Sequence, residues 1–291
     1  MGAAGRGRDS LPPAGTVLGE RYRLARLIAE GGMGAVYEAV DQTTDTVVAV
    51  KLLHPELSRE SDIRRRFRRE SSVLKALDHP AIVRIFDIGA GDDELLYSVM
   101  ERLEGRTLLE VLTAAGTMEA SGILPIVQGI AGGLEAAHEH GVIHGDLTPS
   151  NVFILGDGSE GLGDVKLLDF GLSKVLGLER LTRTGELMGT PAYMAPELLT
   201  GKGELDERID TYSFGVLLYQ CLSGRPPFEG NVPGKLMMDI VMGKATPLDE
   251  VTDGVPSDVV AVVAQAMSRQ REARFGSARA LCRAYTSALA G

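Results

Sequence analysis

The most informative motif of the sequence is His144-Gly145-Asp146-Leu147-Thr148-Pro149-Ser150-Asn151, near the middle of a chain of 291 residues. An aspartate with an asparagine five residues later can place a proton acceptor beside an oxygen ligand for a metal ion. Asp169-Phe170-Gly171 follows directly after the apolar run Val165–Leu168, and GTPAYMAPE at Gly189–Glu197 comes after that. Each short motif is common by chance, whereas their order and spacing together are specific.

A glycine-rich stretch lies nearer the N-terminus, at Ile28–Val36 (IAEGGMGAV). Glycines at this spacing let backbone N–H groups approach phosphates, because no Cβ stands in the way. A dinucleotide-binding turn would lead into a helix, but a strand-like segment follows here, which argues against a Rossmann unit. A glycine-rich hairpin turn without a ligand is the alternative interpretation.

Lys51 ends the alternating strand Val48-Ala49-Val50, where a cation needs either solvent or a partner. Glu70 lies on the apolar helix face made by Phe67, Leu74 and Leu77. A carboxylate facing inward there would be costly unless it were paired, and Lys51 is a natural partner. An exposed glutamate at the edge of the apolar stripe is the alternative.

Hydrophobic periodicity predicts an α+β fold, with a small antiparallel β-rich region followed by a larger helical region and a join near residues 101–103. Regular structure is expected to begin near Arg21, after a flexible leader over residues 1–20. The expected strands are Tyr22–Leu24, Ala35–Val40, Thr46–Leu53, Ile82–Ile88 and Glu94–Glu101. The expected helices begin near Glu60 and near Ile123 (ending at Gly141), and cover Tyr212–Leu222, Val259–Met267 and Ser277–Leu289.

The helix that begins near Glu60 carries a run of arginines, mostly on the faces away from its apolar stripe: Arg64, Arg65, Arg66, Arg68 and Arg69. Such a run is compatible with a binding patch for acidic partners. The charge pattern favours the simpler interpretation, a solvated helix face.

Acidic residues outnumber basic ones by 40 to 30, giving a formal net charge of −10. This balance argues against a nucleic-acid or anionic-membrane binder. No apolar run approaches the roughly 18–20 residues that span a bilayer. The only cysteines, Cys221 and Cys282, exclude a disulfide scaffold and a four-thiolate zinc site, and they favour the cytoplasm.

Taken together, the motifs resemble those of the eukaryotic-type (Hanks-type) serine/threonine protein kinases, in the style of the bacterial members, over Arg21 to Leu289. The resemblance implies a bilobal protein kinase-like fold over residues 21–290, with an N-lobe (21–101), a hinge (101–103) and a C-lobe (104–290). It implies transfer of the γ-phosphate of ATP, with Mg²⁺ (or Mn²⁺), to Ser/Thr hydroxyls of protein substrates, and autophosphorylation.

The resemblance also implies a role for each motif residue. Asp146 would accept or orient the proton of the substrate hydroxyl. Lys51 would contact the α- and β-phosphates, held by an ion pair with Glu70, and Asn151 and Asp169 would hold the metal ions.

Other positions carry supporting roles by the same resemblance. The expected ATP-binding residues are Ile28, Ala29, Gly31, Gly34, Val36, Ala49, Lys51, Met100, Glu101, Leu103 and Phe153. Asp210 would anchor the catalytic loop, Glu197 would pair with Arg274, and Thr190 would position the substrate by bonding Asp146. Thr182 and Thr184 are the candidate phosphorylation sites.

The sequence departs from the family pattern at three positions. Ala29 replaces the first loop glycine, which costs little if φ is negative. Gly145 replaces the arginine that pairs with a phosphorylated activation loop, so phosphorylation loses its main receptor. Thr148 replaces a lysine that contacts the γ-phosphate, and its loss is expected to cost about one to three powers of ten in rate.

Two other functions compete with a protein kinase. A nucleotide-binding pseudokinase or scaffold is favoured by the three departures and opposed by the intact set of motif residues. A small-molecule phosphotransferase is suggested by HGDLTPSN, but Ser173–Met194 and Ala195-Pro196-Glu197 are typical of peptide-binding kinases. Since no sensor domain is evident, we expect control by a cytoplasmic regulatory partner or by autophosphorylation.

Overall fold

The computed structural model describes residues 11–32, 34–91, 95–156, 162–170, 191–201, 205–230 and 232–290, without the side chains of residues 66 and 69–71. The chain forms two compact units. Unit 1 comprises Met1–Asp78 and Val83–Leu103, and unit 2 comprises His79–Ile82 and Glu104–Gly291. The boundary between them follows the segment 101–103.

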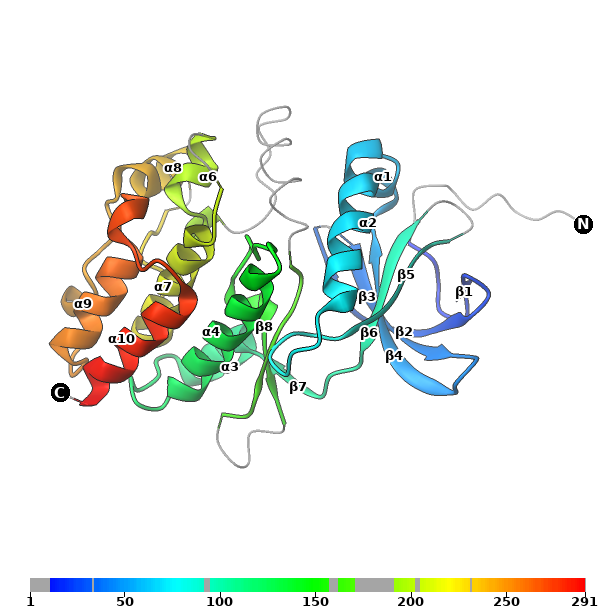
Figure 1. Ribbon diagram of the computed structural model, residues 1–291, viewed down its shortest axis with the longest axis horizontal. Helices are drawn as coiled ribbons and strands as arrows, with labels where there is room; N and C mark the ends of the chain where they lie inside the picture. Colours follow the sequence, from blue (N-terminus) through cyan, green and yellow to red (C-terminus); the bar gives the residue numbers. More distant parts are fainter. Residues whose placement is uncertain are drawn as a thin grey trace, which may run out of the picture. The chain divides into compact units, whose positions relative to one another are not determined.

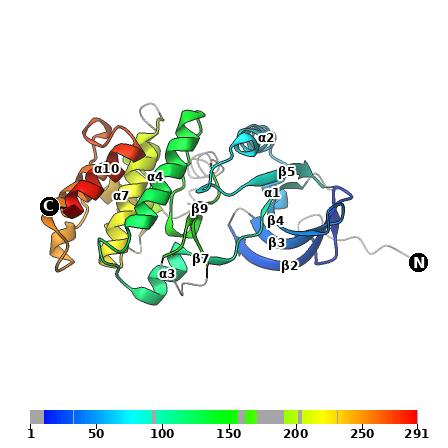
Figure 2. The ribbon, with the colours of Figure 1, turned by 60° about the horizontal axis from the view of Figure 1, so that its bottom comes forward.

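Unit 1 is built on an antiparallel six-stranded sheet with the order β1-β2-β3-β4-β6-β5, which confirms the expected β-rich region (Figures 1 and 2). Two helices follow β4 in the chain. The elements are β1 (Val17–Leu18), β2 (Tyr22–Gly31), β3 (Gly34–Asp41), β4 (Thr46–Leu53), α1 (Pro55–Ser58), α2 (Ser61–Ala76), β5 (Ile85–Ala90) and β6 (Leu96–Glu101).

The two faces of this sheet differ because successive side chains of a strand point to opposite sides. One face supplies a buried cluster that includes Tyr37, Val50 and Val99. The opposite face carries Lys51, which is paired with Val36 on β3 and with Ser98 on β6. The alternation that drives core formation therefore leaves the lysine on the other side of the sheet.

Residues 11–20, which were expected to belong to a flexible leader, are held against the sheet. Val17–Leu18 forms β1 and pairs with β2, and Leu18 is buried. Two further contacts hold the preceding residues: the Tyr37 hydroxyl donates to the Pro12 carbonyl at 3.0 Å, and the Gly15 N–H donates to the Leu24 carbonyl at 2.7 Å. The expectation of a flexible leader is therefore wrong for residues 11–20, because their backbone groups bond to the sheet.

The strand expected at Ile82–Ile88 begins later, at Ile85. Ile82 instead forms a parallel bridge with Leu167, and the Leu167 N–H donates to the Ala81 carbonyl at 2.8 Å. An apolar run that serves two units in succession looks continuous in the sequence, which explains the misplaced boundary.

Unit 2 is mainly helical, as expected. In Figure 1, α4, α7 and α10 run through it as long helices. The central helix α7 is buried at every residue from Ile209 to Leu222, which confirms the expectation for Tyr212–Leu222. The helices are α3 (Leu108–Ala115), α4 (Leu124–Glu139), α6 (Pro196–Thr200), α7 (Arg208–Ser223), α8 (Pro233–Met242), α9 (Ser257–Ala266) and α10 (Ala278–Ala290).

Short elements complete unit 2. A three-stranded antiparallel sheet has the order β7-β8-β9, with β7 (Gly105–Thr107), β8 (Val152–Leu155) and β9 (Val165–Leu167). The 3₁₀ turns are η1 (Pro149–Asn151), η2 (Pro191–Tyr193), η3 (Leu248–Glu250) and η4 (Arg271–Ala273). Within the described part of the chain, no helix is both long enough and apolar enough to cross a membrane.

Candidate active site

Five of the expected nucleotide-binding residues of unit 1 lie on the sheet face opposite the buried cluster, whereas Glu101 is paired with Val48 of that cluster. Ala29 is paired with Val36, Val36 with Lys51, and Ala49 with Met100. Because cross-strand partners share a face, these five side chains lie on one side of the sheet. Alternation along β3 and β4 thus separates the core-forming residues from the candidate binding residues.

The two glycines of the loop differ in what their neighbours require. A Cβ at Gly34 would overlap the backbone carbonyl of Leu52, so close strand packing alone demands glycine there. At Gly31, by contrast, a Cβ would meet no atom within 4 Å. Gly31 is therefore the position where the missing side chain leaves open space beside the backbone, as a phosphate-binding loop needs.

Two neighbours of Gly31 add to this description. Ala29 is not among the described residues with positive φ, so replacing the usual glycine there causes no backbone strain. The His54 ring nitrogen Nε2 lies 2.8 Å from the Gly31 carbonyl oxygen and ties the end of the loop to the start of α1. Sequence reasoning missed His54, since no local pattern connects it with the loop. Ile28, the first expected loop residue, is exposed on β2.

Lys51 lies near the end of β4 and is buried, with 7% of its surface exposed. A buried ammonium group is costly unless polar groups compensate it, so packing alone does not explain the burial of Lys51. Glu70 lies on α2 as expected, but its side chain is outside the described part of the structure. The Lys51–Glu70 ion pair therefore stays a prediction.

The segment after Met100 is held by charged side chains of unit 1. The Glu101 carboxylate accepts from the Arg84 N–H at 2.8 Å. Arg102, which sequence reasoning missed, donates to the Leu103 carbonyl and pairs with Glu38 at 3.2 Å. Hydrogen bonds from Arg26 and Arg102 keep the pKa of the Glu38 carboxyl below its usual range. The arginine therefore fixes the peptide group of Leu103.

In unit 2, the catalytic loop is anchored by Asp210 on α7, whose side chain is fully buried. Its carboxylate accepts from the His144 N–H at 2.7 Å and from the Gly145 N–H at 2.6 Å. The His138 ring nitrogen Nε2, on α4, lies 2.7 Å from the same carboxylate. Sequence reasoning missed His138, although its place beside the buried stripe of α4 was an available signal.

Gly145 has a φ of 72°, in the left-handed region that glycine adopts without strain. A residue with a Cβ would pay about 1–2 kcal/mol in this conformation. Glycine in place of the family's arginine therefore removes backbone strain from the turn that Asp210 holds. The same replacement removes a guanidinium group.

Asp146 and Asn151 lie together. The Asn151 side-chain amide donates to the Asp146 backbone carbonyl at 2.8 Å and to its carboxylate oxygen Oδ2 at 3.1 Å. Because the amide nitrogen of Asn151 is used in this way, its side-chain oxygen Oδ1 is left as the group available to a ligand. The Asp146 N–H in turn donates to His144 Nδ1 at 3.3 Å.

Asp169 follows β9 and has a φ of 55°, an uncommon value for a residue with a Cβ. Strained backbone of this kind is concentrated at functional positions. The neighbouring Phe170 is buried, and its ring lies 4.5 Å from the ring of His144, centroid to centroid. Phe170 is thereby packed against His144 of the catalytic loop.

These residues fit a divalent metal ion. Carboxylate and amide oxygens suit a hard cation, and Asp169 and Asn151 supply one of each. Among the described residues, no group of three or more His, Cys, Asp or Glu side chains could hold a metal. An ion held by Asn151 and Asp169 would have room for phosphate oxygens and water as further ligands, which is the usual arrangement for Mg²⁺.

Phe153 and Thr148 complete the loop. Phe153 lies on β8, half-buried, between Thr107 on β7 and Lys166 on β9. Thr148 is buried, with 8% of its surface exposed. Its neutral hydroxyl brings no charge to the place where the family has a lysine. Thr182, Thr184 and Thr190 lie outside the described residues, and their expected roles stay predictions.

Glu197 and Arg274 form a bidentate pair in unit 2, with N–O distances of 2.7 and 2.9 Å. The Arg274 guanidinium also lies over the Tyr212 ring, 4.8 Å from its centroid. The pair joins α6, which follows the segment 191–195, to the end of η4. Its place is structural, as expected.

The pH dependence of stability offers a test of this loop. Burial lowers the pKa of His144, with Asp210 and Asp169 acting in the opposite direction. Above pH of about 6.5, His144 is neutral in the folded and unfolded states. Below it, the unfolded chain binds a proton that the folded chain does not, so His144 lowers the free energy of unfolding by up to about 1.4 kcal/mol per pH unit.

We expect His144→Phe to remove this contribution, because phenylalanine keeps a ring against Phe170 but does not titrate. Urea unfolding at pH 7.5 and at pH 5.5 measures the loss in each protein. A variant that loses as much stability as the parent between the two pH values would contradict the prediction.

The chain is similar to known proteins over nearly its whole length. A family model described as a protein kinase domain matches residues 22–286. The chain is 37% identical over 287 residues to serine/threonine-protein kinase pkn2 of Myxococcus xanthus, covering 95% of this chain and 34% of the relative. It is 35% identical over 274 residues to serine/threonine-protein kinase PknL of Mycobacterium tuberculosis, covering 94% of this chain and 66% of the relative.

A third relative, serine/threonine-protein kinase PksC of Streptomyces coelicolor, is 39% identical over 272 residues, covering 90% of this chain and 48% of the relative. The chain thus spans between about a third and two thirds of the length of these curated relatives. Among solved structures, the kinase domain of M. tuberculosis PknI matches with a TM-score of 0.78 and 25% identity, covering 97% of this chain and 100% of that one.

Proposed function

Given that the chain belongs to the protein kinase family, we propose that it is an active enzyme that transfers the γ-phosphate of ATP to Ser and Thr hydroxyls of proteins, its own included. The observation that carries the proposal is the pairing of Asp146 with Asn151 on a loop anchored by Asp210. A pseudokinase would not need a carboxylate and an amide oriented against each other in this way.

The residues of unit 2 have complementary tasks in this reaction. Asp146 accepts or orients the proton of the attacking hydroxyl, and Asn151 holds the Asp146 carboxylate in place by its amide N–H. Asp210 fixes the backbone of His144 and Gly145, the two residues before Asp146. The Asp146 carboxylate is therefore positioned before the substrate arrives.

Nucleotide and metal complete the site. Membership of the family implies use of ATP and a divalent metal ion. We propose Mg²⁺ (or Mn²⁺), held by Asn151 and Asp169; such an ion neutralises charge on the phosphates when bound. Lys51 contributes a further positive charge, which an acidic chain of net charge −10 has to supply locally.

We also propose a cellular location and partners for the protein. The thiols of Cys221 and Cys282 are both free, which is usual in the cytoplasm. We therefore place the protein there, acting in signalling on protein substrates and responding to a cytoplasmic regulatory partner. Nucleic acid and membrane are not expected among its partners.

Incubation with ATP followed by mass spectrometry tests the proposed activity. With Mg²⁺ or Mn²⁺ we expect phosphate on serine or threonine of the protein itself and of an added protein acceptor, and none in EDTA. The Asp146→Asn variant is the control for a contaminating kinase. Equal incorporation by that variant, or no incorporation by the parent, would refute the proposal.

Dependence on loop phosphorylation is expected to be weak, because Gly145 offers no guanidinium to a phosphorylated Thr182 or Thr184. The double variant Thr182→Ala/Thr184→Ala should keep its phosphotransfer rate within about tenfold of the parent, since little phosphate-dependent ordering is lost. The rate is measured on the same protein acceptor, with circular dichroism to check folding. Nearly complete loss of activity in a folded double variant would contradict this expectation.

A further inference from the structure

A pocket of ≈ 360 Å³ lies within unit 1. Its size is at the lower end of the range of about 300–1,000 Å³ that is usual for ligand sites. One wall comes from helix α2 and the other from strand β5. The lining residues are Arg68, Ser72, Lys75, Ile88, Gly89 and Ala90.

The helix wall is basic. Arg68, Ser72 and Lys75 follow one another at spacings of four and three, so they lie along one face of α2. Arg68 is exposed, and no described carboxylate forms an ion pair with it. The Ser72 hydroxyl donates to the Arg68 carbonyl at 2.6 Å, which leaves the hydroxyl oxygen as an acceptor. A basic helix face on an acidic protein attracts negative charge.

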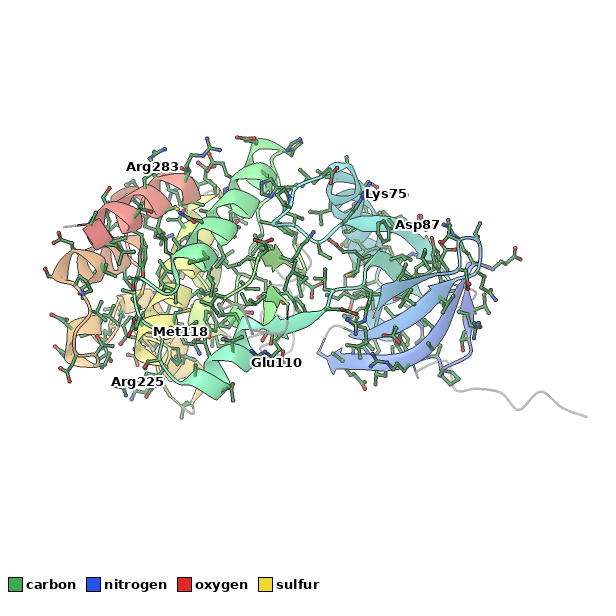
Figure 3. The ribbon with its side chains drawn as sticks, turned by 90° about the horizontal axis from the view of Figure 1, so that it is seen from below. Lys75, Asp87, Glu110, Met118, Arg225 and Arg283 are labelled. Carbon is green, nitrogen blue, oxygen red and sulfur yellow. The ribbon has the colours of Figure 1, made fainter. Side chains whose placement is uncertain are left out.

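Lys75 is already partly compensated. Its ammonium lies 3.4 Å from the Asp87 carboxylate, and Figure 3 labels both residues, on α2 and at the sheet. The same carboxylate accepts from the Tyr22 hydroxyl and from the Ile88 N–H, both at 2.9 Å. Asp87 is thus occupied by groups of its own unit, and Arg68 remains the cation available to a ligand.

The strand wall is a sheet edge. β5 is the last strand of the order β1-β2-β3-β4-β6-β5. The Gly91 N–H donates to the Leu95 carbonyl at 2.9 Å, across the hairpin. Backbone groups in an antiparallel pair alternate in direction, so Gly91 and Gly89 face β6 while Ile88 and Ala90 face outward. The bond from the Ile88 N–H to the side chain of Asp87 agrees with this alternation.

The outward edge can pair with an added strand through the N–H of Ala90 and the carbonyls of Ile88 and Ala90, since exposed edges present backbone N–H and C=O groups. The Ile88 N–H is already bonded to the Asp87 side chain. An extended peptide that joins such an edge gains main-chain hydrogen bonds, and its alternate side chains reach the neighbouring surface. Here that surface is the basic face of α2. The two walls therefore select the same occupant, with extended backbone and acidic side chains.

We propose that this pocket docks an extended acidic segment of a protein partner, paired with the edge of β5 and bound through its carboxylates by Arg68. None of the residues that line the pocket is among those proposed for phosphotransfer, so the test of this site does not depend on activity. It also changes the interpretation of Arg68 within the arginine run on α2, because a merely solvated side chain needs neither a pocket nor an open strand edge beside it.

Fluorescence anisotropy with synthetic peptides tests the proposal on the whole chain. The probe is a labelled octapeptide of alternating valine and glutamate, matched by one of alternating valine and glutamine. We expect the glutamate peptide to bind more tightly, and Arg68→Glu to weaken it by about tenfold or more, since a charge-assisted bond is replaced by repulsion. Arg283→Glu, an exposed arginine on α10, is the matched control and should change the affinity less than about twofold.

A third peptide, with its backbone N–H groups methylated at alternate residues, tests the strand edge and should bind weakly. Equal binding of the glutamate and glutamine peptides, or equal loss in both variants, would overturn the proposal. So would retained binding of the methylated peptide. Self-association of the free protein that Arg68→Glu abolishes would identify a second copy as the occupant. Binding to phosphatidylserine vesicles that Arg68→Glu abolishes would identify a membrane. Either result would also overturn it.

Discussion

Replacing Asp146 by asparagine is expected to lower kcat for phosphoryl transfer by a factor of about 10²–10⁴, the usual contribution of a positioned general base. The asparagine side chain has the same shape but is a far weaker proton acceptor. Its amide oxygen can still accept the hydrogen bond that the Asn151 amide donates at 3.1 Å. The bond from Asn151 to the backbone carbonyl of residue 146 is unchanged. The loop should therefore keep its geometry while the chemical step is lost.

Three measurements separate this outcome from a structural defect. Steady-state kinetics gives kcat, equilibrium binding gives the Kd for ATP, and urea unfolding gives stability. We expect a large change in kcat only. Asp164→Asn, the same substitution at an exposed aspartate before β9, should leave all three quantities unchanged. An Asp146 variant that retained more than about a tenth of the parental kcat would contradict the role of general base.

Much of the fold could be predicted from the sequence, because period and burial are coupled. The run Tyr212–Leu222 is apolar almost all round, and only a buried helix satisfies such a run. The alternation in Thr46–Leu53 predicts a strand with two different faces. The structure shows a buried cluster on one of them and Lys51 on the other.

The missed features depend on contacts between distant residues. β1 forms because the backbone of Val17–Leu18 finds partners on β2, although its composition resembles a flexible leader. Ile82 bridges Leu167 in unit 2, although its pattern continues the strand that follows. Neither partner can be identified from local periodicity.

The candidate site shows the same division. Asp146, Asn151 and Asp169 are found by motif, because the chemistry fixes both residue type and spacing. His138, which shares the carboxylate of Asp210 with the catalytic loop, contributes only through the fold and has no motif of its own. The left-handed backbone of Gly145 is likewise a property of the turn that Asp210 holds.

Glu197→Gln is expected to cost about 3–5 kcal/mol in the free energy of unfolding, because it leaves a buried guanidinium without its counter-charge. The side chain of Arg274 is fully buried, and that of Glu197 is 10% exposed. Arg274 is held further by its bonds to the carbonyls of Ser268 at 2.8 Å and Arg208 at 3.1 Å. These bonds fix the cation in place, so it cannot move to solvent when its partner is neutralised.

An exposed pair gives the matched control. Arg225 and Glu229 lie 3.8 Å apart, and both side chains are about half exposed. Glu229→Gln should cost less than about 1 kcal/mol, since water replaces the lost partner. Urea unfolding of the parent and both variants measures the difference. If the two glutamine variants lost equal stability, the buried pair would contribute no more than a surface pair, and the anchoring of α6 to the end of η4 would have to come from apolar packing instead.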